Sequence, residues 1–177
     1  GGNRFDLGIL CYFPQIWASD NTDAVSRAYI QEGLSYGYPM STVSAHVSVC
    51  PNHQTLRVTP LSTRFNVAAF GICGYECNLV DMSRAERSEI KTQIDIYKKW
   101  RHAMQFGSFY RQRTGNIHQW TVVDEEAGRA VGLIMQELVR ANTQNEEYYA
   151  AGLDPEAVYS FYNRPLKHDV KEFGDLI

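Results

Sequence analysis

Two carboxylates, Asp20 and Asp23, lie three residues apart where an apolar stretch gives way to a predicted helix. Residues 7–17, before them, are mostly apolar and aromatic, which is the composition of a buried strand. After them, an N-cap type residue and apolar positions at helical spacing predict a helix over 23–36. In a barrel of alternating strands and helices, catalytic groups collect at strand ends. Both aspartates are therefore candidates for chemistry.

Asp20 is the candidate for acid–base catalysis. An adjacent indole, Trp17, and apolar neighbours would favour the neutral carboxyl group. A carboxylic acid that stays partly protonated near neutral pH can donate a proton to a leaving group. The alternative is structural, because an aspartate just before a helix commonly caps it. On spacing alone, capping by Asp20 or Asp23 is the favoured interpretation.

Longer sequence motifs favour the catalytic interpretation over helix capping. They are Arg-Phe-Asp-Leu-Gly at 4–8, Pro-Gln-Ile-Trp-x-Ser-Asp-x-Thr-Asp at 14–23, Ser-Ala-His-Val-Ser at 44–48, Pro-Asn-His-Gln-Thr at 51–55, Gly-Tyr-Glu at 74–76 and Gln-Phe-Gly-x-Phe-Tyr-Arg at 105–111. In this order they resemble the bacterial and fungal α-galactosidases of glycoside hydrolase family 36. The resemblance is dense over 1–113 and thinner from there to the end.

The resemblance implies retaining hydrolysis of terminal α-linked galactose, as in sugars of the melibiose and raffinose type. In such enzymes one carboxylate attacks the anomeric carbon, while a second protonates the departing oxygen and then activates water. The family's proton donor is the first aspartate of its Ser-Asp-x-Thr-Asp motif, which matches Asp20. The second aspartate matches Asp23, which is expected to orient the loop around Asp20.

Further residues are expected to line the galactoside site or its rim. The opening Gly-Gly resembles the tail of a Cys-Ser-Gly-Gly loop that lines the galactose site in the family, and His53 lies in a loop leaving a strand end. The expected substrate-binding residues are Gly1, Gly2, Trp17, Asp20, Asp23 and His53. His46, a lone histidine on a predicted strand, is expected to be structural, since the chemistry requires only carboxylates.

The expected nucleophile is missing from the sequence. Family members carry it in a Lys-Trp-Asp-x-Asn-like motif on an earlier strand, and the 177 residues contain no such motif. The resemblance therefore implies a fragment of a longer enzyme that holds only part of the active site. The chain alone is expected to be inactive.

The fold implied by the resemblance is α/β, with the C-terminal portion of a (β/α)8 TIM barrel over 1–113. The start of an antiparallel β domain is expected over 114–177. Residue patterns predict strands over 40–49 and 71–79, a helix over 60–69, a long helix after the capping box at 83–86, and strands over 116–123 and 130–135 around a polar turn.

Composition excludes several other classes. The formal net charge of −3 with mixed signs argues against nucleic acid or an anionic membrane as partner, and no apolar run is long enough to cross a bilayer. The four cysteines form neither a disulfide framework nor a zinc motif, so buried free thiols and a cytoplasmic location are expected. No metal or organic cofactor is implied. Family members often form tetramers, so the parent enzyme is expected to be a homo-oligomer.

Two alternative functions stay open. Plant relatives of the same fold transfer galactose to a sugar acceptor and build raffinose-type oligosaccharides, because water and sugar compete for one intermediate. Those relatives usually vary the Ser-Asp motif, which favours hydrolysis here. The other alternative is a non-catalytic carbohydrate-binding module formed by 114–177, although no exposed aromatic platform is evident in its pattern.

Overall fold

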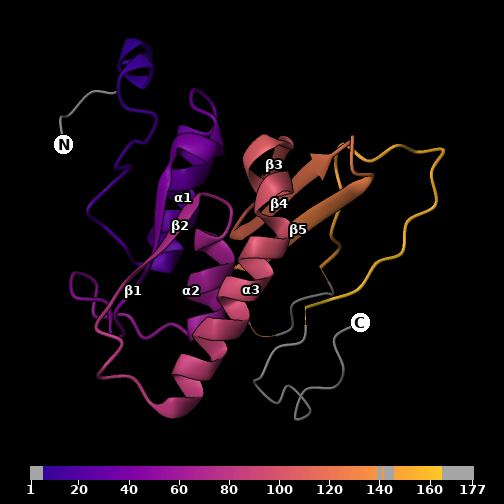
Figure 1. The fold of residues 1–177 in the computed structure, drawn as a ribbon. Helices are drawn as coiled ribbons and strands as arrows, with labels where there is room; N and C mark the ends of the chain where they lie inside the picture. Colours follow the sequence, from indigo (N-terminus) through magenta and orange to yellow (C-terminus); the bar gives the residue numbers. More distant parts are fainter. Residues whose placement is uncertain (1–5, 139–140, 142–145, 165–177) are drawn as a thin grey trace.

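The computed structural model describes residues 6–138, 141 and 146–164, and over these it confirms an α/β composition. The elements are η1 (Leu7–Cys11), α1 (Ala24–Leu34), η2 (Met40–Thr42), β1 (Ser44–Ser48), α2 (Leu61–Ala68), β2 (Ile72–Glu76), α3 (Arg84–Phe106), β3 (Ser108–Thr114), β4 (Ile117–Asp124) and β5 (Arg129–Gln136). Figure 1 shows α3 running beside β1, β2 and α2, with β3, β4 and β5 gathered near its C-terminal end.

Parallel strands form the first part of the molecule. β1 pairs with β2, and Ile16 forms a parallel bridge to Val43 on the other edge of this strand segment. Val43, Ala45 and Val47 are fully buried, whereas Val49, which continues the same alternation, is 44% exposed, so the strand over 40–49 is confirmed in a shorter form. β2 follows Gly71, where an added Cβ would lie 2.6 Å from the Val43 carbonyl oxygen, so close packing requires glycine.

The buried strand expected over 7–17 is wrong. η1 forms there instead, and none of its residues is buried. The Asp6 carboxylate caps η1 by accepting from the Gly8 amide at 2.8 Å, and Pro14 has no N–H to donate to a strand ladder. Ile16, which bridges to Val43, is the residue of this stretch that is buried, and the partly buried Leu10 packs against the same core cluster. The cap at Asp6 and the proline at position 14 therefore outweigh the apolar composition of this stretch.

The two shorter helices match their predictions closely. α1 begins after its N-cap residue Asp23, and α2 begins after Pro60 and ends at Ala68. Phe65 of α2 packs with Ala45 in one core cluster. The segment between Ile16 and α1 therefore connects elements that are fixed by packing against one another.

The long helix α3 begins at the predicted capping box. The Ser83 hydroxyl accepts from the Glu86 amide at 3.2 Å, and the Ser83 amide donates to the Glu86 carboxylate at 2.8 Å. Ile90 and Met104 are buried on the face turned to α2 and β1. The helix ends before Gly107.

Loss of this cap has a predictable effect. Ser83→Ala removes the acceptor for one amide in the first turn of α3, and we expect a loss of about 1 kcal/mol of helix stability. Hydrogen exchange of the amides near Glu86 should accelerate, while those near Met104 should not change. Ser88→Ala, inside the same helix, is the control, and an equal acceleration in that variant would contradict a capping role.

A three-stranded antiparallel sheet forms the second part. β4 lies between β3 and β5, and the predicted strands over 116–123 and 130–135 are confirmed as β4 and β5. The sheet begins at Ser108, in a stretch that the sequence interpretation assigned to the barrel part. The division of the chain after residue 113 stays a prediction.

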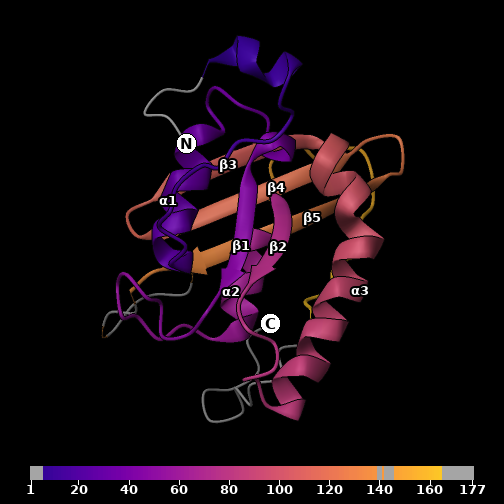
Figure 2. The same ribbon diagram turned by 60° about the vertical axis from the view of Figure 1, so that its left-hand side comes forward.

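The central strand is buried on both faces. Figure 2 shows the sheet crossing behind α1, β1 and β2. Trp120 of β4 joins Val43 and Phe70 in a core cluster that spans the two parts of the molecule. On the other face Thr121 contacts the Tyr148 hydroxyl at 2.5 Å. β4 is therefore fixed from both sides.

A cluster of buried charged groups also joins α1 to the sheet. His118 of β4 is fully buried; its Nδ1 lies 2.7 Å from Glu32 Oε2 of α1, and its Nε2 lies 2.6 Å from Glu137 Oε1 after β5. The Trp120 indole donates to the same Glu32 oxygen at 3.1 Å. Both ring nitrogens of His118 therefore lie within hydrogen-bond distance of a carboxylate oxygen. We call these four residues the His118 cluster.

The cysteines differ from expectation in their burial. All four are free thiols, but Cys11 is exposed, while Cys50, Cys73 and Cys77 are only partly buried. Burial still raises the pKa of the Cys73 thiol to about 12. Among the helices of the described residues, none combines the length and apolar character that a membrane span needs.

Candidate functional site

Asp20 lies in the short segment between the Ile16 bridge and α1. Its carboxylate is exposed, and its Oδ1 accepts a hydrogen bond of 2.7 Å from the Trp17 indole Nε1. The indole packs against His46 of β1, with ring centroids 4.4 Å apart. The expected apolar surroundings of Asp20 are therefore not observed within the described residues, where the neighbouring indole donates a hydrogen bond.

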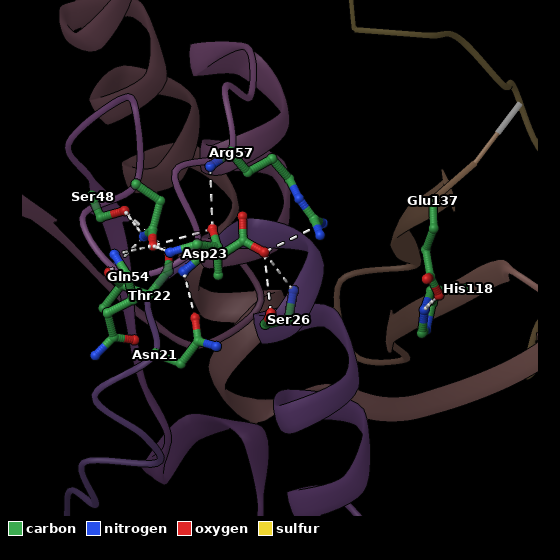
Figure 3. Close-up of polar contacts among 11 residues, drawn as sticks. Asn21, Thr22, Asp23, Ser26, Ser48, Gln54, Arg57, His118 and Glu137 are labelled. Atoms are coloured by element: carbon green, nitrogen blue, oxygen red, sulfur yellow. Dashed lines mark hydrogen bonds and ion pairs between the residues drawn. The ribbon is translucent and has the colours of Figure 1, made fainter.

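Asp23 caps α1 and is 2% exposed. Its Oδ2 accepts from the Ser26 amide at 3.2 Å and the Ser26 hydroxyl at 3.1 Å, and Arg57 Nη1 lies 3.4 Å from the same oxygen. The Asn21 side chain accepts from the Asp23 amide at 3.0 Å (Figure 3). The capping interpretation is therefore right for Asp23, and these bonds fit its predicted support of the Asp20 loop.

The loop after β1 is tied to the same segment through Asn52, which is buried. Its Nδ2 donates to the Thr22 hydroxyl at 3.3 Å, and its Oδ1 accepts from the amides of Gln54 and Thr55, both at 3.0 Å. The Ser48 hydroxyl donates to the Thr22 carbonyl at 3.1 Å, and Figure 3 shows Ser48 and Thr22 facing each other beside Asp23. The sequence interpretation gave Asn52 no separate role, although asparagine is a common turn residue.

Removal of the Asn52 side chain should loosen this loop. In Asn52→Ala the amides of Gln54 and Thr55 lose their acceptor, and the buried Thr22 hydroxyl loses a donor, so we expect a loss of about 1–3 kcal/mol. The check is the thermal midpoint together with hydrogen exchange over 52–57. Gln54→Ala is the control, since its exposed side chain should change neither. Equal effects of both variants would contradict the role of Asn52.

Two buried arginines hydrogen-bond to backbone carbonyls around the candidate site. Arg27 of α1 donates to the carbonyls of Ser19, at 3.3 Å, and Ser44, and burial lowers its pKa to about 10. Arg64 of α2 donates to the Thr59 carbonyl at 3.1 Å and to the Ser48 carbonyl. Both fix loop and strand ends through backbone carbonyls. Nothing in the local sequence pattern identified these partners.

A shallow hollow lies beside the Trp17 indole, lined by Phe13, Pro14, Gln15, Trp17 and Ser44. The Gln15 amide donates to the Ser44 hydroxyl at 2.6 Å across it. Apolar rings and a polar pair in one depression are a surface that a sugar could contact.

The remaining predicted site residues are His53, Gly1 and Gly2. His53 is exposed on the loop that Asn52 holds, whereas Gly1 and Gly2 lie outside the described residues. Asp20, Trp17 and Asp23 lie in one continuous segment. The described residues contain no group of three or more His, Cys, Asp or Glu side chains that could hold a metal ion.

Comparison with known proteins identifies the class as glycoside hydrolases. Residues 1–107 match the Melibiase family model, and residues 117–174 match the model of the glycosyl hydrolase family 36 C-terminal domain. The chain therefore belongs to the melibiases of glycoside hydrolase family 36, as the motifs predicted.

Individual relatives support the same family assignment. The chain is similar to alpha-galactosidase Mel36A of Lactobacillus acidophilus, at 44% identity over 90% of the chain and 22% of that protein. It is also similar to alpha-galactosidase AgaA of Geobacillus stearothermophilus, at 43% identity and the same coverage. The crystal structure of the alpha-galactosidase from Lactobacillus brevis superposes with a TM-score of 0.84, at 44% identity over 88% of this chain and 22% of that one. The chain thus spans about a fifth of the length of the relatives it matches.

Proposed function

We propose that this chain supplies the acid/base part of a retaining α-galactosidase that releases terminal α-linked galactose. The observation that carries the proposal is the exposed Asp20 carboxylate, which follows the Ile16 bridge within a chain similar to alpha-galactosidases over 90% of its length. An exposed carboxylate can reach a glycosidic oxygen, whereas the buried Asp23 is occupied by its capping bonds.

The fold we propose for the whole catalytic domain is a (β/α)8 TIM barrel. The Ile16 bridge, β1 and β2 would be neighbouring parallel strands, and α1, α2 and α3 would be the helices that follow them. The antiparallel sheet would begin the C-terminal β domain. The support is the alternation of parallel pairing and helices, which is the repeating unit of such barrels.

The mechanism assigns two proton transfers to Asp20. In the first step the protonated carboxyl group gives its proton to the glycosidic oxygen as a nucleophilic carboxylate bonds to the anomeric carbon. In the second step ionised Asp20 takes a proton from water, which displaces that nucleophile and releases galactose. The nucleophile would come from a part of the enzyme that precedes this chain in the relatives' motif order. We therefore propose that these 177 residues alone are inactive.

The proposed substrates are galactosides of the raffinose type. Crystal structures of variants of the AgaA enzyme, at 43–44% identity, are complexes with raffinose and stachyose. Trp17 and Asp20 would contact the sugar, with Gly1, Gly2 and His53 at the site or its rim and Asp23 behind it. A cytoplasmic location and a homo-oligomeric, tetrameric parent enzyme also stay proposals.

The experiment is an assay of the full-length enzyme with raffinose, with products identified by NMR. Hydrolysis predicts free galactose and sucrose in equal amounts. Larger galactosyl oligosaccharides as the main product would favour the transferase alternative. No release of galactose would contradict both catalytic proposals.

A further inference from the structure

We propose that Trp17 is a positioning residue that tunes proton transfer at Asp20 through its indole N–H, and that His46 holds the indole in place. This inference rests on the proposed function, because it concerns the protonation of the proposed acid/base. It goes beyond that function by assigning two residues the balance between the acid step and the base step.

The first part of the argument is the direction of the hydrogen bond. An indole N–H can only donate, and the Asp20 Oδ1 atom receives it at 2.7 Å. A hydrogen bond to a carboxylate is stronger than one to the neutral acid, so this contact favours the ionised form. Within the described residues, it is the hydrogen bond that the Asp20 carboxylate receives. The contact therefore stabilises the ionised carboxylate that the base step requires.

The second part is the orientation of the indole. Trp17 is 44% exposed, so the core does not fix its ring. The His46 ring lies against it, with an interplanar angle of 46° and a centroid separation of 4.4 Å. His46 itself is half-buried on β1, in register with Gly74 of β2. The His46 ring, which is held on β1, thus packs against the more exposed ring of Trp17.

The third part is the charge state around this pair. Burial, and then the nearby Arg27 guanidinium, lower the pKa of His46, while Glu76 acts in the opposite direction. His46 Nδ1 is buried and has no hydrogen-bond partner within the described residues, which fits a neutral ring. The other charged residues near the segment, Arg57 and Asp23, form an ion pair with each other. His46 therefore acts as a neutral packing partner.

The test is the pH dependence of kcat/KM for raffinose in the full-length enzyme. Trp17→Phe keeps an aromatic ring but removes the N–H, so the ionised Asp20 carboxylate loses this hydrogen bond. We expect the basic limb of the profile to move upward, because the N–H that stabilises the carboxylate is gone. Tyr12→Leu, at an exposed aromatic outside the contact, is the control and should leave the profile unchanged.

Variants of His46 test the supporting role. His46→Ala should shift the basic limb in the same direction and lower kcat, because the indole loses its backing. His46→Phe, which restores a flat ring, should return the profile toward that of the wild type. A purely structural role of His46 would lower kcat or stability without moving the limb, and that result would overturn its assignment.

A third variant keeps the shape of the Trp17 side chain, so that it tests the N–H even if Trp17→Phe disturbs the fold. Benzothienylalanine at position 17 replaces the indole N–H by sulfur, and it should give the same upward shift as Trp17→Phe. An unchanged profile in this folded variant overturns the inference. If Asp20→Ala in the same enzyme still loses activity, the proposed function stands and only the inference fails. If the wild-type enzyme releases no galactose, the proposed function itself has failed.

Discussion

Asp20→Ala in the full-length enzyme is expected to lower kcat/KM for raffinose by about 10²–10⁴-fold, the usual contribution of general acid–base catalysis. The departing sugar of raffinose is a poor leaving group and needs the proton that Asp20 supplies. An aryl galactoside with an acidic phenol departs without that proton, so its kcat/KM should fall much less. The measurement is the ratio of the two losses in parallel assays.

The control is another exposed aspartate. Asp95 of α3 pairs with Lys91 at 3.0 Å on the surface, so Asp95→Ala should leave both substrates unaffected. Asp20→Asn serves as a near-isosteric variant that keeps the Trp17 bond partner but cannot donate a carboxylic proton. Equal losses on raffinose and on the aryl galactoside in the Asp20 variants would contradict the acid/base role.

His118→Ala is expected to cause the largest loss of stability, about 3–5 kcal/mol. His118 is fully buried between Glu32 and Glu137, so its removal takes a partner from both carboxylates and leaves Glu32 with the Trp120 indole. Because the His118 cluster joins α1 to the sheet, the loss should appear on both sides. The measurements are the thermal midpoint and hydrogen exchange of peptides from α1 and β4.

His102 provides a matched control. Its Nδ1 lies 3.2 Å from Asp124 Oδ2, but its side chain is 58% exposed. Asp124 is buried but keeps Arg129 Nε at 3.3 Å and the Ala127 amide at 3.2 Å, so His102→Ala should change the thermal midpoint little. If the two variants lost equal stability, or if α1 exchanged no faster in His118→Ala, the joining role of the His118 cluster would be wrong.

The elements that the sequence predicted well depend on signals within a few residues. The Ser83 capping box involves only Glu86, three residues away, and it marks the start of α3 correctly. Alternation of valine and alanine with polar residues marks Ala45 and Val47 of β1 as buried, but Ser44 and Ser48 are buried as well. Apolar composition alone does not specify a strand over 7–17, where the Asp6 cap and the proline at position 14 favour a short 3-10 helix and a turn.

The site was predictable only in part, because its supports are distant in sequence. Asp20 and Asp23 have the same local pattern, and the family motif was needed to separate the candidate acid from the helix cap. Asn52 bonds to Thr22 across 30 positions, and His118 meets Glu32 across 86. No local period encodes such contacts, so these residues become recognisable only once the fold brings them together.

The most direct test of the acid/base assignment is chemical rescue of Asp20→Ala. Without its acid/base, the enzyme should still form the covalent galactosyl intermediate from an activated aryl α-galactoside and then hydrolyse it slowly. Azide needs no general base, so adding it should restore turnover and give α-galactosyl azide, with retained configuration, by NMR. Absence of rescue would contradict the assignment, and β-galactosyl azide would show that Asp20 is the nucleophile instead.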